Sequence, residues 1–225
     1  MTQVTVARPA SDARYVAGRS ETPDPARLRL MEGLASALTD KGYAATTIAD
    51  IVAHARVSKR TFYEHFTDKE DCLVAVYELA CSRLVDVLRD APVDGQAWQD
   101  RVRATVAAYL SAIEATPTLT RTLLLEIQAA GARAFRVRNR MQRRFADVLC
   151  ELVEQGRVDN PEVRPLSPAL ALAIVGGVNE LLLHAVDPYP SDDGPAPPPD
   201  PEHPFTSLTE AVTELVSAVL SHHIG

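Results

Sequence analysis

The segment 46–69, TTIADIVAHARVSKRTFYEHFTDK, constrains this chain more than any other, because two short amphipathic stretches flank a brief interruption there. Thr47 and Asp50 form a capping-box pattern at the start of the first stretch, and Ser58 can cap the second. Helices this short are unstable in isolation, so each must pack its single apolar face against a partner. The segment therefore predicts two helices packed on each other and on an amphipathic helix at 25–41, as a helix-turn-helix unit.

The second of these helices is expected to project outward, because Phe62 and Phe66 mark the face that it buries. Lys59 and Arg60 lie in its first turn, where the helix dipole favours phosphate and an arginine can reach a guanine edge in the major groove. A Lys-Arg pair alone is more often simply solvated, but the turn spacing, the caps and the Tyr-x-His pattern favour DNA binding. The predicted DNA contacts are Thr46, Thr47, Ser58, Lys59, Arg60, Thr61, Tyr63, His65 and Lys69.

The run TTIADIVAHARVSKRTFYEHFTDKE resembles the N-terminal DNA-binding domain of TetR-family (tetracycline-repressor-like) transcriptional regulators, and the resemblance covers about residues 25–75. It implies a homodimer that binds a near-palindromic operator in double-stranded DNA and is released by a small molecule. By position it also implies that the residues facing DNA are Thr47, Lys59, Arg60, Thr61, Tyr63, His65 and Lys69.

One residue departs from the family pattern, which usually has glycine in the turn where this chain has Arg56. A non-glycine residue with a positive φ costs on the order of 1 kcal/mol. Either the turn has a different backbone here, or Arg56 accepts that strain; its position beside the groove would also allow a phosphate contact.

Helical periodicity continues along the rest of the chain and predicts an all-α fold of about nine helices. We expect a flexible arm at 1–23, a helix-turn-helix DNA-binding domain at 24–70 and a ligand-binding and dimerisation domain at 71–225. Prolines concentrate in 188–204, which predicts an extended surface loop there. Beyond the helix-turn-helix unit, helices are expected near 68–88, 96–115, 117–129, 131–156, 168–186 and 206–222.

Charge, cysteine content and motifs exclude several classes of protein. The net charge is −7, divided into +2 over residues 1–66 and −9 over the remainder, so basic character is confined to the N-terminal part. Three scattered cysteines, Cys72, Cys81 and Cys150, give no disulfide framework or zinc site and are expected to be buried. With no catalytic, phosphate-binding or dinucleotide motif, we expect neither an enzyme nor a metal or other cofactor.

Localisation and membrane contact follow from the absence of targeting segments. The N-terminus lacks the apolar core of a signal peptide. The uncharged apolar stretch Ser167–Asn179 is too short to cross a bilayer. A cytoplasmic protein without membrane insertion is therefore expected.

The resemblance also predicts an effector cavity in the helical bundle. The candidate lining residues are Trp98, Tyr109, Phe135 and Asn179; plain core packing is the alternative for the aromatic residues, and solvent exposure for Asn179. Five arginines share one broad helix face, which either receives an anionic effector such as an acyl-coenzyme A or, as we favour, is solvated and ion-paired with nearby acids. These arginines are Arg133, Arg136, Arg140, Arg143 and Arg144.

Two late helices suit dimerisation. Gly176 and Gly177 lower the helix propensity of 168–186, and small residues there would let another helix approach closely. The helix at 206–222 presents an apolar face, and two copies of each helix would make a four-helix interface; packing within one chain is the alternative. The sequence thus predicts a ligand-responsive transcriptional regulator, expected to be a repressor, with a small helical enzyme or carrier protein as the alternative.

Overall fold

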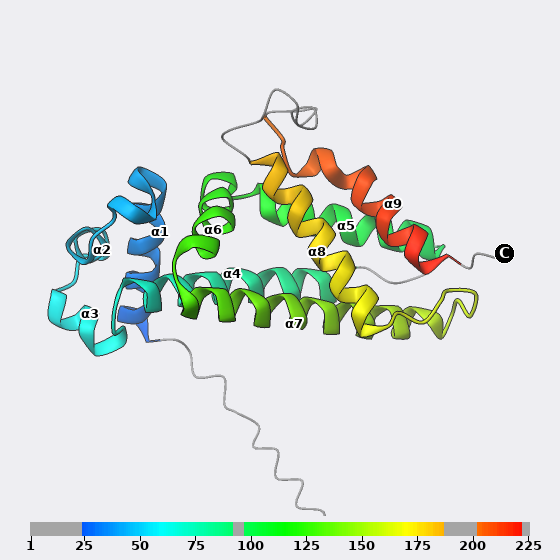
Figure 1. Ribbon diagram of the computed structural model, residues 1–225, viewed down its shortest axis with the longest axis horizontal. Helices are drawn as coiled ribbons and strands as arrows, with labels where there is room; N and C mark the ends of the chain where they lie inside the picture. Colours follow the sequence, from blue (N-terminus) through cyan, green and yellow to red (C-terminus); the bar gives the residue numbers. More distant parts are fainter. Residues whose placement is uncertain (1–23, 92–96, 187–201, 222–225) are drawn as a thin grey trace, which may run out of the picture.

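A computed structural model of the 225-residue protein describes residues 24–91, 97–186 and 202–221, and within these ranges every regular element is a helix (Figure 1). The predicted all-α fold is confirmed. The expected arm at 1–23 and most of the proline-rich loop lie outside the described residues. The elements are α1 (Pro25–Ala45), α2 (Ile48–Ala55), α3 (Lys59–His65), α4 (Lys69–Arg89), α5 (Trp98–Glu114), α6 (Pro117–Ala129), α7 (Ala132–Arg157), α8 (Pro168–Ala185), a 3-10 turn η1 (Thr206–Leu208) and α9 (Thr209–Leu220).

Helices α1, α2 and α3 form the predicted helix-turn-helix unit at one end of the molecule (Figure 1). The caps expected at Thr47 and Ser58 are present, and Asp24 caps α1 in the same way: the side chain of each accepts a backbone amide of the helix that follows. Helix α2 lies so close to α1 that a Cβ atom on Gly33 would come within 2.6 Å of a backbone oxygen of α2. Phe62 is wholly buried beneath this pair, which fixes the orientation of α3.

Arg56 ends α2 in the left-handed conformation, with φ 53° and ψ 44°. Of the two possibilities that the sequence left open, this is the strained one. The bend that aims α3 away from α2 is therefore made by an arginine, at a cost on the order of 1 kcal/mol relative to glycine.

Helix α4 leaves the helix-turn-helix unit and runs beside α7 along the second half of the molecule (Figure 1). The two helices point the same way, since Asp68, Glu78 and Arg89 at successive positions contact Arg133, Arg140 and Glu151 of α7, respectively. Helices α5, α6, α8 and α9 pack above this pair. The apolar core of α1 to α3 continues into α4, α6 and α7.

The N-termini of α4, α6 and α9 differ in how they are capped. Asp68 caps α4, because its carboxylate accepts the Asp71 amide at 2.8 Å. Thr116 makes no side-chain cap at α6. Before α9, the Ser207 hydroxyl donates to Pro204 instead of capping, and a 3-10 turn precedes the helix.

Two of the three cysteines behave as small buried apolar residues, as predicted. Cys72 and Cys81 are buried, and burial raises the pKa of both thiols to about 12. All three cysteines are free thiols, and Cys150 is half-buried.

Helix α8 is exceptional among the described helices, because it alone is long and apolar enough to cross a membrane by length and composition. This differs from the sequence-based expectation, which considered only uncharged stretches and so stopped before Glu180. Only 17% of its residues are buried, whereas a core helix would be mostly covered. The exposed residues include Leu170 and Leu172, so α8 presents an apolar face that its own chain does not cover.

Candidate functional site

Helix α3 carries the most prominent polar and basic side chains of the helix-turn-helix unit. The side chain of Arg60 is 90% exposed, Tyr63 is 60% exposed, and Lys59 is also exposed, while Phe62 faces the core between them. Helix α3 lies at the outer end of the molecule, next to α2 and away from α5, α8 and α9 (Figure 1). The structure therefore brings Lys59, Arg60 and Tyr63 together on one accessible surface.

Neighbouring polar residues orient this surface. The Arg60 guanidinium is held by Glu64 one turn later, with 3.1 Å between Nε and Oε1. The hydroxyls of Ser58 and Thr61 share a hydrogen bond of 3.0 Å at the start of α3. The exposed Thr47 hydroxyl donates to Asp50, whose pKa is held below its ordinary value by Lys41 and Thr47.

Three predicted DNA contacts differ in the structure, because their side chains are engaged within the fold. Thr46 is buried, and its hydroxyl donates to the Gly42 carbonyl at 2.6 Å. His65 is mostly covered and lies 4.0 Å from Asp24, on the side of α3 that faces α1. The Lys69 ammonium donates to two backbone carbonyls, so none of these three side chains is among the proposed DNA contacts.

Lys69 ties the end of α1 to the start of α4. Its ammonium donates to the carbonyls of Tyr43 and Thr46, at 2.7 and 2.8 Å, and lies over the Tyr43 ring. Partial burial lowers the pKa of Lys69. The Tyr43 amide in turn donates to Glu126 of α6 at 3.1 Å, so the same corner joins three helices.

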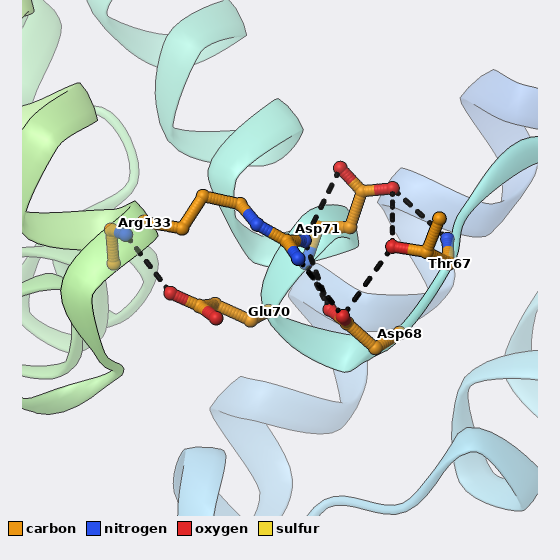
Figure 2. A network of polar contacts seen from close by, with 6 residues as sticks. Thr67, Asp68, Glu70, Asp71 and Arg133 are labelled. Carbon is orange, nitrogen blue, oxygen red and sulfur yellow. Dashed lines mark hydrogen bonds and ion pairs between the residues drawn. The ribbon is translucent and has the colours of Figure 1, made fainter.

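A second junction, shown in Figure 2, joins the start of α4 to the start of α7. The Arg133 guanidinium donates to both oxygens of Asp68, at 3.2 and 3.1 Å, and lies 3.6 Å from Asp71. Partial burial alone would raise the pKa of Asp68, but the Asp71 amide and Arg133 outweigh it and lower that pKa. We call Asp68, Asp71 and Arg133 the α4–α7 clamp.

Glu70 supports the clamp by capping α7 from outside that helix. Its Oε1 accepts the Ala134 amide at 3.0 Å, a role that the N-cap residue Gly131 cannot fill without a side chain. Gly131 has φ 127°, and a Cβ atom there would lie 2.9 Å from the same oxygen. The positive φ therefore favours glycine at this turn, and a side chain there would also displace the Glu70 carboxylate from its capping position.

The arginine face of α7 fits the ion-paired alternative of the sequence analysis. Arg133 binds the clamp acids, Arg140 pairs with Glu78, and Arg144 donates to Ser82. These contacts hold α7 along α4, and none of these three arginines lines the cavity between α4 and α9.

An elongated, mostly apolar cavity of about 240 Å³ lies between α4, α5, α6, α7, α8 and α9. Three of the four predicted ligand contacts, Trp98, Tyr109 and Asn179, line it. Phe135 does not line the cavity. Its side chain is 55% exposed on the outer face of α7, so the prediction that it lines the cavity is wrong. Aromatic character alone could not tell which face of α7 would be covered.

Sequence reasoning missed several polar lining residues, namely Tyr77, Thr105, Thr120 and Gln142. Tyr77 and Tyr109 are buried by the surrounding helices, which raises the pKa of both phenols. In the sequence, these residues occur at helical spacings that are typical of core positions. The cavity beside them forms only when six helices pack together. Within the described ranges, no three His, Cys, Asp or Glu side chains gather into a group that could hold a metal ion.

Replacing Arg133 with methionine is expected to lower the free energy of unfolding, since it leaves Asp68 and Asp71 without their shared cation. Urea denaturation measures the change. Arg136→Met, an exposed arginine on the same helix, is the matched control and is expected to change stability by less than about 0.5 kcal/mol.

The clamp also predicts a pH dependence. Because the folded-state pKa of Asp68 is lowered, its contribution is fully present above the ordinary Asp pKa of 3.8 and is lost as pH falls through the folded value. The stability difference between the native chain and Arg133→Met is therefore expected to shrink below about pH 4. A difference that stays constant down to pH 2 contradicts an ionic clamp.

Comparison with known proteins agrees with this geometry. The sequence profile of the bacterial regulatory proteins of the TetR family matches residues 30–76. The HTH-type transcriptional activator FasR of Mycolicibacterium smegmatis is 32% identical over 107 residues, which is 48% of each chain. The chain spans from a quarter to about half the length of the curated relatives it matches.

Solved structures share the fold over nearly the whole chain. The fatty acid degradation regulator FadR from Bacillus halodurans superposes with a TM-score of 0.70 at 20% identity, over 89% of this chain and 98% of that one. FadR from Bacillus subtilis, solved in complex with stearoyl-CoA, has a TM-score of 0.67 at 15% identity, over 86% and 98%. The profile match therefore identifies residues 30–76, across α1 to α4, as similar to the DNA-binding segment of the TetR-family bacterial regulatory proteins, and the solved structures share the helical fold of the chain.

Proposed function

We propose that this protein is a ligand-responsive transcriptional repressor that binds a near-palindromic operator as a homodimer and is released by a small molecule. The observation that carries the proposal is the exposed Lys59, Arg60 and Tyr63 surface at one end of a fold whose other end encloses an apolar cavity. One chain therefore contains both a surface suited to DNA binding and a cavity suited to a ligand.

The proposed DNA contacts divide by chemistry. Arg60 can pair with a guanine edge in the major groove, after exchanging Glu64 for the base. Lys59 and the Tyr63 hydroxyl suit phosphate oxygens, as do the hydroxyls of Thr47, Ser58 and Thr61 beside two helix N-termini. Arg56, exposed in the turn, is a further candidate for a phosphate contact.

A second copy of the chain is the proposed cover for the apolar face of α8, together with α9. A side chain on Gly176 would meet nothing within 4 Å, whereas Gly177 packs against Leu215 of α9, so Gly176 lies on the open side of the α8–α9 pair. Two copies related by a two-fold axis would place their α3 helices to read two half-sites. Covering α8 in this way is consistent with a cytoplasmic protein that does not enter a membrane.

Release from DNA is proposed to be a population shift. A ligand that favours an arrangement in which the two α3 helices no longer match successive major grooves would draw the protein off its operator. The coupling elements are α4, which lines the cavity and starts at the clamp, and α6, which lines it and binds Tyr43 through Glu126.

The lining of the cavity supports an effector with a large apolar part. Leucine, isoleucine and valine dominate the lining, and the similarly folded FadR of Bacillus subtilis binds stearoyl-CoA. A fatty acyl compound is therefore the first effector class to test for this chain.

Selection from randomised duplexes tests the function directly, and the full-length protein is expected to enrich a near-palindromic sequence. Arg60→Ala is expected to lose about 1–3 kcal/mol of binding to that sequence while leaving binding to unrelated DNA nearly unchanged. Fluorescence anisotropy at several salt concentrations measures both. Arg136→Ala is the matched control. Equal weakening on every sequence would reassign Arg60 to a phosphate, and no enrichment at all would overturn the proposed function.

A further inference from the structure

The cavity is a long channel that runs along α4 and α7. Its lining extends from Tyr77 to Leu88 on α4 and from Gln142 to Gly156 on α7. At 1.5 Å per residue these spans are about 17 Å and 21 Å. The end near Tyr77 adjoins α6 and the helix-turn-helix unit, whereas the end near Leu88 and Gly156 lies farthest from it. A single extended chain fits this shape better than a compact ring system.

Arg101 is the sole charged residue among those that line the channel. It is half-buried in the first turns of α5 and lies at the far end of the channel, where a side chain on Gly156 would come within 3.5 Å of its Nη2 atom. Among the described residues, no carboxylate lies within ion-pair distance of the Arg101 guanidinium. Arg103, two residues later, instead pairs with Glu210 outside the channel.

A guanidinium at the far end of an apolar channel, with no described carboxylate within ion-pair distance, complements a ligand of defined polarity. Burying an unpaired charge beside apolar surface is unfavourable, and an anion placed there would form charge-assisted hydrogen bonds to a fork of donors. A neutral apolar ligand would leave the guanidinium N–H donors of Arg101 without an acceptor. The charge pattern therefore selects a negatively charged head at Arg101 and an apolar chain along the channel.

On the basis of the proposed function, we infer that the effector is a single-chain anionic amphiphile whose carboxylate or phosphate head binds Arg101 and whose chain end reaches α6. Thr120, Leu123 and Leu124 of α6 line the inner end of the channel. Glu126 on the same helix holds the Tyr43 amide at 3.1 Å. Arg101 thus determines binding, and chain length determines whether the ligand reaches the helix that touches the DNA-binding unit.

Trp98 provides a direct measurement, because it is the single tryptophan of the chain and lines the channel one turn before Arg101. Saturated fatty acids from octanoate to stearate, the matching primary alcohols and the matching coenzyme A thioesters are titrated into the full-length protein while Trp98 emission is recorded. Arg101→Met is expected to weaken binding of the anionic compounds about tenfold or more, and Arg101→Lys to retain most of it. Alcohol binding is expected to be the same in all variants, and Arg103→Met is the matched control.

The arms of the titration separate the possible heads. A larger Arg101 dependence for the free acids assigns a carboxylate, and a larger dependence for the thioesters assigns the coenzyme A phosphates. Equal affinity of Arg101→Met and the native chain for every anionic compound would overturn the inference.

Operator release measured in parallel tests the orientation. Short acids are expected to change Trp98 emission without releasing DNA, and long acids to do both; release that does not depend on chain length overturns the proposed orientation. If the protein selects no duplex DNA, the proposed function fails while the titration still reports the ligand class. If it binds DNA but Arg101→Met behaves as the native chain, only this inference fails.

Discussion

Replacing Gly176 with glutamate is expected to separate the dimer and to weaken operator binding about a hundredfold or more, because each half-site is then bound without its linked partner. A side chain at this position meets open space within its own chain, so the monomer can accept it. Glutamate also has a higher helix propensity than glycine by about 0.5–1 kcal/mol. The substitution therefore favours the α8 helix while it disfavours the interface.

Analytical ultracentrifugation and anisotropy on the selected operator measure the two effects, and circular dichroism checks that helix content is unchanged. Gly176→Ala is expected to keep the dimer, because alanine still allows close helix approach. Gln99→Glu adds the same charge at an exposed position on α5 and is expected to change neither property. A Gly176→Glu protein that remains dimeric and binds DNA normally would show that the α8 face has another partner, a membrane among them.

Adjacent aromatic residues of α3 are expected to give opposite results. Phe62→Ala is expected to lower the free energy of unfolding by about 3–5 kcal/mol, because Phe62 is wholly buried among α1, α2 and α3. Tyr63→Ala removes a ring that is 60% exposed and touches Phe62 only edge-on, so its cost is expected to be about 1 kcal/mol or less. By contrast, Tyr63→Ala is expected to lower the affinity for the operator about tenfold under conditions where the variant is fully folded.

Urea denaturation and operator anisotropy, done on the same preparations, separate the two roles. Tyr63→Phe keeps the ring and removes the hydroxyl, so it is expected to match the native chain in stability and Tyr63→Ala in DNA binding. Native-like DNA binding by Tyr63→Ala would remove Tyr63 from the proposed interface. A small stability loss in Phe62→Ala would contradict its place in the core.

The helix-turn-helix unit was predictable because its signals are local. Caps such as Thr47 and Ser58, and the spacing of Phe62 and Phe66, depend on neighbours within a few residues, and each short helix has only one face to bury. The same reasoning placed Arg60 and Tyr63 outside. It could not show that Lys69 donates to Tyr43 and Thr46, because these partners lie more than twenty residues earlier in the chain.

The cavity was less predictable, because a residue that lines a hole has the same pattern as one that fills a core. Trp98 and Phe135 are both aromatic residues on amphipathic helices, yet one lines the channel and the other faces solvent. Arg101 lies near other charged residues of α5, and no feature of the local sequence distinguishes it from Arg103. Which of the two turns inward depends on where α7 and α9 lie.

By itself, the sequence determined the all-α class, the helix-turn-helix unit and the exposed basic first turn of α3, because capping and apolar periodicity act over distances of one or two helical turns. The tertiary structure alone decided that Arg133 closes the α4–α7 clamp, that Lys69 serves the fold, and that Arg101 is the charge within the channel. Those assignments require side chains from separate helices to meet, and the relative placement of helices is set by the packing of the whole core.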